Sequence, residues 1–132
     1  MAKKQKNVTT ACPCSGSSFE GCCKPYLDGD AVAPTALALM KSRYTAFCVG
    51  DESYLRYTWL KQNRPSGRII DKKDMTKWVG LKIVSHQEEG DHATVEFVAS
   101  YKRNGRLMRL HENSQFIREE DGCWYYIDGT FF

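Results

Sequence analysis

The spacing of hydrophobic residues along this chain changes from a helical to an extended pattern near Trp78. Before that point, apolar residues recur every three or four positions, as on one face of a helix, at Leu37, Met40, Tyr44 and Phe47. Pro34 and Thr35 precede this stripe and Gly50 follows it. Because these residue types favour the two ends of a helix, the pattern predicts a helix between them.

Two further helices are expected before the pattern changes. Asp51 can cap a second helix, whose apolar side carries Leu55, Thr58 and Trp59. The polar residues 61–69 then predict a loop. A short third helix is expected over Asp71–Trp78, with Asp71 as its cap.

Beyond Trp78 the hydrophobic residues alternate with polar ones, which is typical of half-buried strands. The alternating runs hold Leu81 and Ile83, then Val95 to Tyr101, then Met108 to Phe116, and finally Trp124 and Tyr126. They are separated by turn-forming sequences, Glu89-Gly90-Asp91, Asn104-Gly105 and Asp121-Gly122. The sequence therefore predicts a four-stranded antiparallel meander preceded by helices, an α+β domain.

The composition of the chain mainly excludes classes of protein. The chain has 132 residues and a net charge of +3, which suits one globular domain and gives no argument for nucleic acid or an anionic membrane. No apolar run approaches the roughly 20 residues of a membrane span. Residues 1–10 carry Lys3, Lys4 and Lys6 without an apolar stretch, so we expect a flexible basic tail rather than a secretory signal. The expected location is cytoplasmic.

The strongest chemical signal is a cluster of cysteines. Of the 6 cysteines, Cys12, Cys14, Cys22 and Cys23 lie close together in a segment rich in glycine and serine. In a reducing compartment, clustered thiols are more often metal ligands than disulfides. Four thiolates suit tetrahedral Zn²⁺ and leave no open coordination position, so such a site would be structural. A labile disulfide, unliganded thiols and an iron–sulfur cluster are the alternatives. Lys24, or backbone amides of the loop, could offset the negative charge of the thiolates.

This segment resembles the SEC-C motif, best known from the C-terminal tail of the preprotein translocase SecA: Cys-Pro-Cys, a Gly/Ser-rich spacer, then Cys followed by His or Cys. The rest of the chain resembles the YchJ-like family. The matching segments are Cys22 to Gly29, Ala33 to Thr35, Leu39 to Phe47, Thr58-Trp59, Trp78 to Leu81, Val95 to Tyr101, Glu112 to Phe116 and Trp124 to Gly129. The spacer here is one residue shorter than the commonest form. A histidine that many members carry after the tryptophan of the second helix is replaced by Leu60.

The resemblance implies a zinc knuckle on a nuclear transport factor 2-like (SnoaL-like) cone, in which helices pack on a curved sheet. We therefore expect a flexible tail at residues 1–10, a SEC-C-like knuckle at residues 11–33 and the cone at residues 34–132. The family's biochemical role is not established.

Cones of this kind can enclose a cavity, so polar residues on the inner face of the sheet matter. Alternation places Glu112 and Ser114 on the same face as Met108, Leu110 and Phe116, and this face is expected to look inward. Among apolar neighbours Glu112 could act as a general base, although pairing with Arg43 from the first helix is the favoured interpretation. Asp128 is a second candidate acid, but a turn at the end of its strand is favoured.

The remaining reactive side chains are expected to be structural. His86, His92 and His111 fall on the outer face or in turns, which predicts surface positions rather than metal ligands. Trp59, Trp78 and Trp124 are expected in the core, and Cys48 and Cys123 behave as ordinary apolar residues.

Two hypotheses of function remain. The preferred one is a zinc-binding adaptor that presents the knuckle, with Lys3, Lys4, Lys6 and Lys24, to a protein or ribonucleoprotein partner; the resemblance to SecA suggests a secretion chaperone or the ribosome. The alternative is a small-molecule binder or enzyme that uses the cone cavity, with Glu112 as base. Sequence-specific binding of nucleic acid is disfavoured because the basic residues are scattered.

Overall fold

Helices occupy the first half of the chain and strands the second. The computed structural model describes residues 11–14, 18–71, 73 and 75–132. The basic tail expected at residues 1–10 lies outside the described residues. The short elements η1 (Phe19–Gly21) and α1 (Lys24–Leu27) surround the cysteines, and α2 (Ala36–Val49), α3 (Glu52–Tyr57) and η2 (Lys61–Asn63) follow.

The two predicted helix starts and the predicted stop are confirmed. The Thr35 hydroxyl accepts the N–H of Ala38 at the start of α2, and Gly50 ends that helix in the left-handed conformation with φ 79°. The Asp51 carboxylate accepts the N–H of Tyr54 at the start of α3. No helix in the described part of the chain is long and apolar enough to cross a membrane.

Four strands form one antiparallel sheet in the order β2-β3-β4-β5. They are β2 (Lys77–Glu89), β3 (His92–Arg103), β4 (Arg106–Arg118) and β5 (Trp124–Phe131). Asn104 and Gly105 connect β3 to β4 with φ values of 54° and 77°. Positive φ at both central positions is the geometry that an Asn-Gly hairpin turn requires, which explains this predicted turn.

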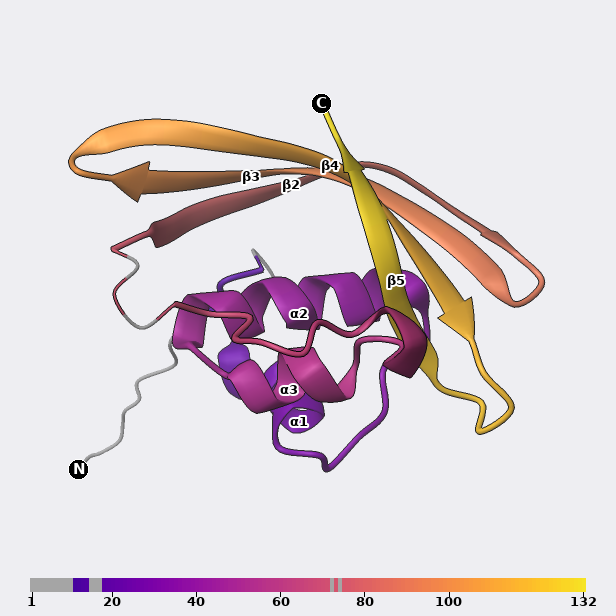
Figure 1. Cartoon of the computed structure of the whole chain (residues 1–132). Coiled ribbons are helices and arrows are strands. Elements are labelled where there is room, and N and C mark those ends of the chain that lie inside the picture. Colours follow the sequence, from indigo (N-terminus) through magenta and orange to yellow (C-terminus); the bar gives the residue numbers. More distant parts are fainter. Residues whose placement is uncertain (1–10, 15–17, 72, 74) are drawn as a thin grey trace, which may run out of the picture.

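The molecule is built in layers around α2 (Figure 1). The curved sheet covers one side of this helix, and α1 and α3 lie on the other side (Figure 1). Strands β2, β3 and β5 all contact α2, as do both short helices. Because α2 is covered on both sides, buried residues occur all around it, including the polar residues Ser42, Arg43 and Thr45.

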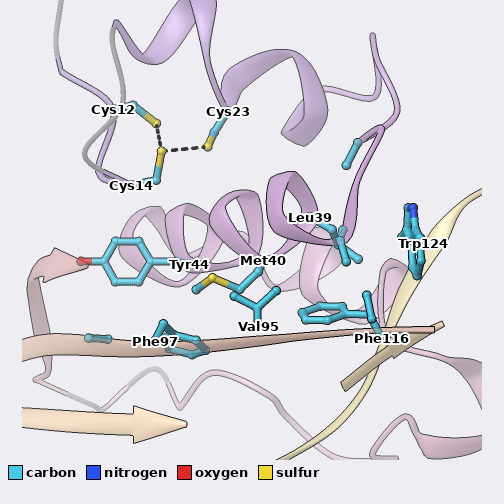
Figure 2. Packing of buried hydrophobic residues seen from close by; sticks show 14 residues of the cluster. Cys12, Cys14, Cys23, Leu39, Met40, Tyr44, Val95, Phe97, Phe116 and Trp124 are labelled. Carbon is cyan, nitrogen blue, oxygen red and sulfur yellow. Dashed lines mark hydrogen bonds between the residues drawn. The ribbon is translucent and has the colours of Figure 1, made fainter. Parts of the chain in front are cut away.

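The core joins the cysteine segment to the sheet through α2. Figure 2 shows Cys12, Cys14 and Cys23 on one side of α2 and Val95, Phe97 and Phe116 on the other. Leu39 and Phe116 are among the most deeply buried side chains. Burial of a side chain of this size contributes about 1.5–3 kcal/mol, so these contacts fix the helix on the sheet.

The third helix predicted over Asp71–Trp78 is wrong. Strand β2 already begins at Lys77, and Asp71, Met75 and Thr76 lie outside any helix. Trp78 pairs with Tyr101 across the sheet, and its ring packs 6.0 Å from that of Tyr44. These tertiary contacts override the weak helical pattern of the segment.

The second helix is shorter than predicted, because α3 ends before Thr58 and Trp59. The carbonyl of Thr58 accepts the N–H of Tyr126 at 2.9 Å, and the N–H of Leu60 is donated to the carbonyl of Tyr126. The chain after α3 therefore runs beside β5.

Candidate functional site

The structure brings Cys12, Cys14, Cys22 and Cys23 together. Their sulfur atoms all lie within 4.8 Å of one another. The Sγ of Cys14 is 3.5 Å from that of Cys12, 3.5 Å from that of Cys22 and 3.6 Å from that of Cys23. Cys12 and Cys14 approach from the start of the described chain, and Cys22 and Cys23 sit between η1 and α1. Spacing in the sequence alone indicated this set.

The cluster fits a tetrahedral metal ion that prefers sulfur. Zinc–sulfur bonds of about 2.3 Å at tetrahedral angles place neighbouring sulfurs about 3.8 Å apart, close to the separations found here. The donor set is complete, since four sulfurs fill a tetrahedral shell. A metal held there has no position for water or substrate, so the arrangement is suited to stabilising the fold rather than to hydrolysis.

Burial and hydrogen bonds within the cluster raise the pKa values of Cys22 and Cys23 when no cation is bound. Burial, followed by hydrogen bonds with Cys14 and Cys12, raises the pKa of Cys22 to about 11. The pKa of Cys23 is also raised, first by its hydrogen bond with Cys14 and then by burial. Since thiolates are the form that ligates metal, binding must release protons.

The side chain of Thr45 on α2 reaches the sulfur cluster. Its hydroxyl is fully buried, donates to the Sγ of Cys23 at 3.3 Å and lies 3.7 Å from the Sγ of Cys12. A hydrogen bond to a metal-bound sulfur orients the ligand and disperses its charge. Sequence reasoning missed Thr45, because its position opposite the apolar stripe of α2 predicts solvent exposure.

Lys24 makes an ion pair within its own short helix. Its ammonium group binds the carboxylate of Asp28 at 2.6 Å in an exposed pair on α1. Phe19 and Tyr26 pack against the buried cluster that includes Cys12, Cys14 and Cys23.

A second candidate site is a cavity of about 360 Å³ between α2 and the inner face of the sheet. Its lining is mostly apolar and includes Met40, Tyr44, Phe47, Trp59, Trp78, Phe97, Leu110, Phe116 and Phe131. Polar groups enter it from Arg43, Glu112, Ser114 and Tyr126. The predicted inward face of β4 is therefore confirmed from Leu110 to Phe116, and Glu112 does line a cavity. Met108 near the start of β4 is exposed instead, so the prediction is wrong at that residue.

Glu112 is buried and held by two hydroxyl donors. Ser114 donates to its Oε2 at 2.7 Å and Tyr126 donates to the same atom at 2.9 Å. Gly129 of β5 faces this carboxylate so closely that a Cβ built there would lie 1.9 Å from Oε2. The absence of a side chain at Gly129 thus leaves room for Glu112.

The expected ion pair between Arg43 and Glu112 is not formed in the described structure. Arg43 donates instead to the carbonyl of Leu55 at 2.8 Å and to the hydroxyl of Thr58 at 2.7 Å. Its guanidinium lies 4.5 Å from the centre of the Tyr126 ring. Burial lowers the pKa of Arg43 to about 10, and electrostatic interactions with Tyr126, Tyr54 and Glu112 oppose that shift. Tyr126 therefore stands between the two charged groups, touching both.

Asp128 is neither an inner acid nor the end of its strand. Phe116 pairs with Tyr126 while Gln115 pairs with Asp128, so Ile127 is an extra residue in β5. This bulge turns Asp128 to the outer face, where it accepts a hydrogen bond from Gln115 at 3.3 Å.

The histidines lie at the surface as predicted. His86 and His92 are exposed. His111 is half-buried on the outer face of β4 and binds Glu96 at 2.7 Å. Cys48 and Cys123 are half-buried and lie outside the cluster. Burial raises the pKa of Cys48 to about 11, which makes it an unreactive thiol.

Comparison with known proteins agrees with this geometry. The family model for YchJ, middle NTF2-like domain, matches residues 35–129. A UPF0225 protein of Cupriavidus pinatubonensis is 46% identical over 127 residues, covering 91% of this chain and 87% of the relative. A UPF0225 protein of Chromobacterium violaceum is 44% identical and covers 96% of this chain and 97% of the relative.

Two solved structures are similar along most of the chain. A SEC-C motif containing protein of Rhodopseudomonas palustris has a TM-score of 0.80 at 29% identity, covering 92% of this chain and 98% of that one. A SEC-C motif containing protein of Psychrobacter arcticus has a TM-score of 0.74 at 31% identity, covering 92% of this chain and 82% of that one. The sheet and helices described above are thus an NTF2-like domain preceded by a SEC-C cysteine cluster, and this chain belongs to the YchJ family.

Proposed function

We propose that this protein is a binding module in which a structural zinc ion, held by Cys12, Cys14, Cys22 and Cys23, fixes a knuckle on α2 for docking to a protein or ribonucleoprotein partner. The observation that carries the proposal is the closed set of four sulfurs within 4.8 Å of one another. Such a site supplies no free position for chemistry. Its contribution is to the folding of the segment around it.

The knuckle depends on this metal because it has little core of its own. Its helices η1 and α1 are short, and none of their residues is fully buried. The buried residues of the segment are mainly the cysteines themselves, with Ala33 at its exit. Zinc binding provides on the order of 10 kcal/mol, which offsets the entropy of ordering such a segment.

The docking test compares two forms of the same protein. Zinc-loaded and chelated protein are each sedimented with purified ribosomes and passed over an immobilised secretion chaperone. The proposal predicts zinc-dependent retention that Cys23→Ser abolishes and that Cys48→Ser, a thiol substitution outside the cluster, preserves. Equal retention of loaded and chelated protein, or no retention on either partner, would count against docking.

The cavity supports a second candidate function, the binding or conversion of a small molecule. The observation in its favour is a buried carboxylate, Glu112, that lines a mostly apolar space of about 360 Å³. A general base must lie within hydrogen-bonding distance of the substrate, and a carboxylate that lines a cavity meets this condition for a ligand bound there. Glu112→Gln keeps the hydrogen-bonding shape and removes the charge, so it should abolish binding of a cavity ligand while zinc content is unchanged. Unchanged binding in this variant would argue against a role for the carboxylate.

A further inference from the structure

A groove separate from the cone cavity lies beside the cysteine segment. It has a volume of about 410 Å³. Its walls come from α1 and the following loop, from α3, and from the start of β5; the lining includes Tyr26, Leu27, Val32, Ala33, Tyr54, Tyr57, Trp124 and Tyr125. Tyr26 and Leu27 follow Cys22 and Cys23 almost directly, so one wall exists only while the knuckle is folded.

The lining of the groove is that of a protein-binding surface. Four tyrosines contribute to it, and Tyr57 is 70% exposed. Tyrosine and tryptophan supply large contact areas at low cost in conformational entropy, which is why they dominate the energetics of protein interfaces. A tyrosine left at the surface beside a half-open apolar groove therefore marks a place where another chain can pack.

The charge of the groove favours a cationic occupant. Asp28 and Asp51 line it, whereas no lysine, arginine or histidine of the described chain does. Because Asp28 is already paired with Lys24, Asp51 is the lining carboxylate that an incoming cation would meet. At its edge, Asp121 accepts the hydroxyl of Tyr125 at 2.6 Å. This bond and the N–H of Cys123 hold the pKa of Asp121 below its usual value, so that carboxylate stays ionised. A lysine or arginine placed there would meet carboxylates and the faces of aromatic rings, both of which attract it.

The groove wall also contains an unsatisfied donor. The indole N–H of Trp124 is buried and has no hydrogen-bond acceptor, and no other buried side-chain nitrogen or oxygen of the described residues is left in this state. Trp124 itself is 3% exposed. Figure 2 shows the nitrogen end of its ring turned away from Phe116, toward the side of α2 on which the cysteines lie. A buried donor without a partner costs about 1–3 kcal/mol, a cost that an incoming acceptor would remove.

We propose that this groove binds an extended segment of a partner protein that carries a lysine or arginine next to an aliphatic or aromatic residue. The apolar residue packs among the tyrosines, the cation lies near Asp51, and a backbone carbonyl of the segment accepts the N–H of Trp124. The inference rests on the proposed binding function and names its surface and the chemistry of its partner. Because α1 forms one wall, occupancy requires the metal-bound knuckle.

The three tryptophans of the chain allow a direct test. Trp59 and Trp78 line the cone cavity, whereas Trp124 lines the groove. Zinc-loaded, ¹⁵N-labelled protein is titrated with a short peptide of alternating leucine and lysine, and with a matched peptide in which glutamate replaces lysine. The proposal predicts that the lysine peptide shifts the indole signal of Trp124 and leaves those of Trp59 and Trp78 in place. The glutamate peptide should cause no shift.

Substitutions then identify the contacts. Tyr57→Ala should weaken binding of the lysine peptide roughly tenfold, as loss of an aromatic contact does at the centre of an interface. Asp51→Asn keeps the acceptor that caps α3 and removes the charge, so it should weaken binding severalfold and reduce its dependence on salt. Phe132→Ala removes an aromatic ring that is 74% exposed outside the groove and should change nothing.

Two results would overturn the inference. One is a Trp124 signal that neither peptide moves, or that both move equally. The other is an affinity for the lysine peptide that Tyr57→Ala and Asp51→Asn leave unchanged. Zinc content measured on the same samples separates this failure from that of the metal site, since a zinc-loaded protein that ignores the peptides would refute only the groove.

Discussion

Substitution of Gly129 by alanine tests the packing of β5 against the buried carboxylate of Glu112. A Cβ at this position would lie 1.9 Å from Oε2, 2.5 Å from Cδ and 2.8 Å from Cγ of Glu112. Nonbonded atoms do not approach so closely, so either Glu112 or the strand must move. The backbone of Gly129 is not in the left-handed region, and the predicted effect is therefore steric.

The structure can relieve the clash in two ways, and the one that loses less free energy determines the destabilisation. If Glu112 swings away, it loses hydrogen bonds from Ser114 and Tyr126, each worth about 1.5–3 kcal/mol because the acceptor is charged. If β5 shifts instead, overpacking costs about 1–3 kcal/mol. The second response is the less expensive one, so Gly129→Ala should lower the free energy of unfolding by about 2 kcal/mol.

Urea unfolding at a fixed excess of zinc measures this value. Gly67→Ala is the matched control, because no heavy atom lies within 4 Å of a Cβ built at Gly67. It should change stability by less than about 0.5 kcal/mol. In a Glu112→Ala background the clashing atoms are gone, so Gly129→Ala should cost almost nothing there. An equal loss for the two glycine variants, or an undiminished loss in the double variant, would show that contact with Glu112 does not cause the effect of Gly129→Ala.

Three further predictions concern Thr45, Glu52 and Arg43. Thr45→Val removes the hydroxyl that donates to Cys23 and should weaken zinc binding about 10- to 100-fold in a chelator competition. Thr45→Ser keeps the hydroxyl and should keep the zinc affinity. Equal zinc affinities of the valine and serine variants would show that this hydrogen bond does not contribute to zinc binding. The backbone N–H of Ile70 donates to Glu52 at 3.2 Å, and this bond is the first cause of the lowered pKa of that carboxyl. The pKa of Glu52 is lower in the folded protein than in the unfolded chain. Its contribution to the free energy of unfolding is therefore complete at pH values above its usual pKa, and it is lost as the pH falls through the lowered pKa. The NMR chemical shift of the Ile70 amide should therefore change as Glu52 titrates, and this pH dependence should disappear in Glu52→Gln. An Ile70 shift that does not depend on pH in the parent protein would contradict this prediction. Arg43→Lys loses the paired hydrogen bonds and the stacking on aromatic rings and should cost about 2 kcal/mol in urea unfolding, whereas a neutral effect would show that the buried guanidinium is replaceable by any cation.

Local rules predicted much of the fold. The ends of α2 follow from Thr35 and Gly50, whose effects on the backbone do not depend on distant residues. The meander follows from alternation and from turns such as Asn104-Gly105. The set of four cysteines could also be predicted from the sequence, because its members are close in the sequence as well as in space.

The errors arise where distant segments meet. Trp78 belongs to a strand because its ring packs between Tyr44 and Tyr101, which lie far from it in the sequence. Asp128 faces outward because of one extra residue in β5, which the alternation pattern does not reveal. Tyr126 separates Arg43 from Glu112 for the same reason: the pairing of β4 with β5 positions it, and no local pattern indicates that pairing in detail.

A metal ion in the four-cysteine site can be detected by native mass spectrometry. The untagged protein is purified without chelator, supplied with Zn²⁺ under reducing conditions and transferred to a volatile buffer. The predicted mass is that of the reduced chain plus one zinc ion, less the protons that the ion displaces; Cys23→Ser should lose the ion and Cys48→Ser should retain it. A metal-free mass with reduced thiols in the parent protein would contradict the structural zinc site and, with it, the zinc-dependent knuckle.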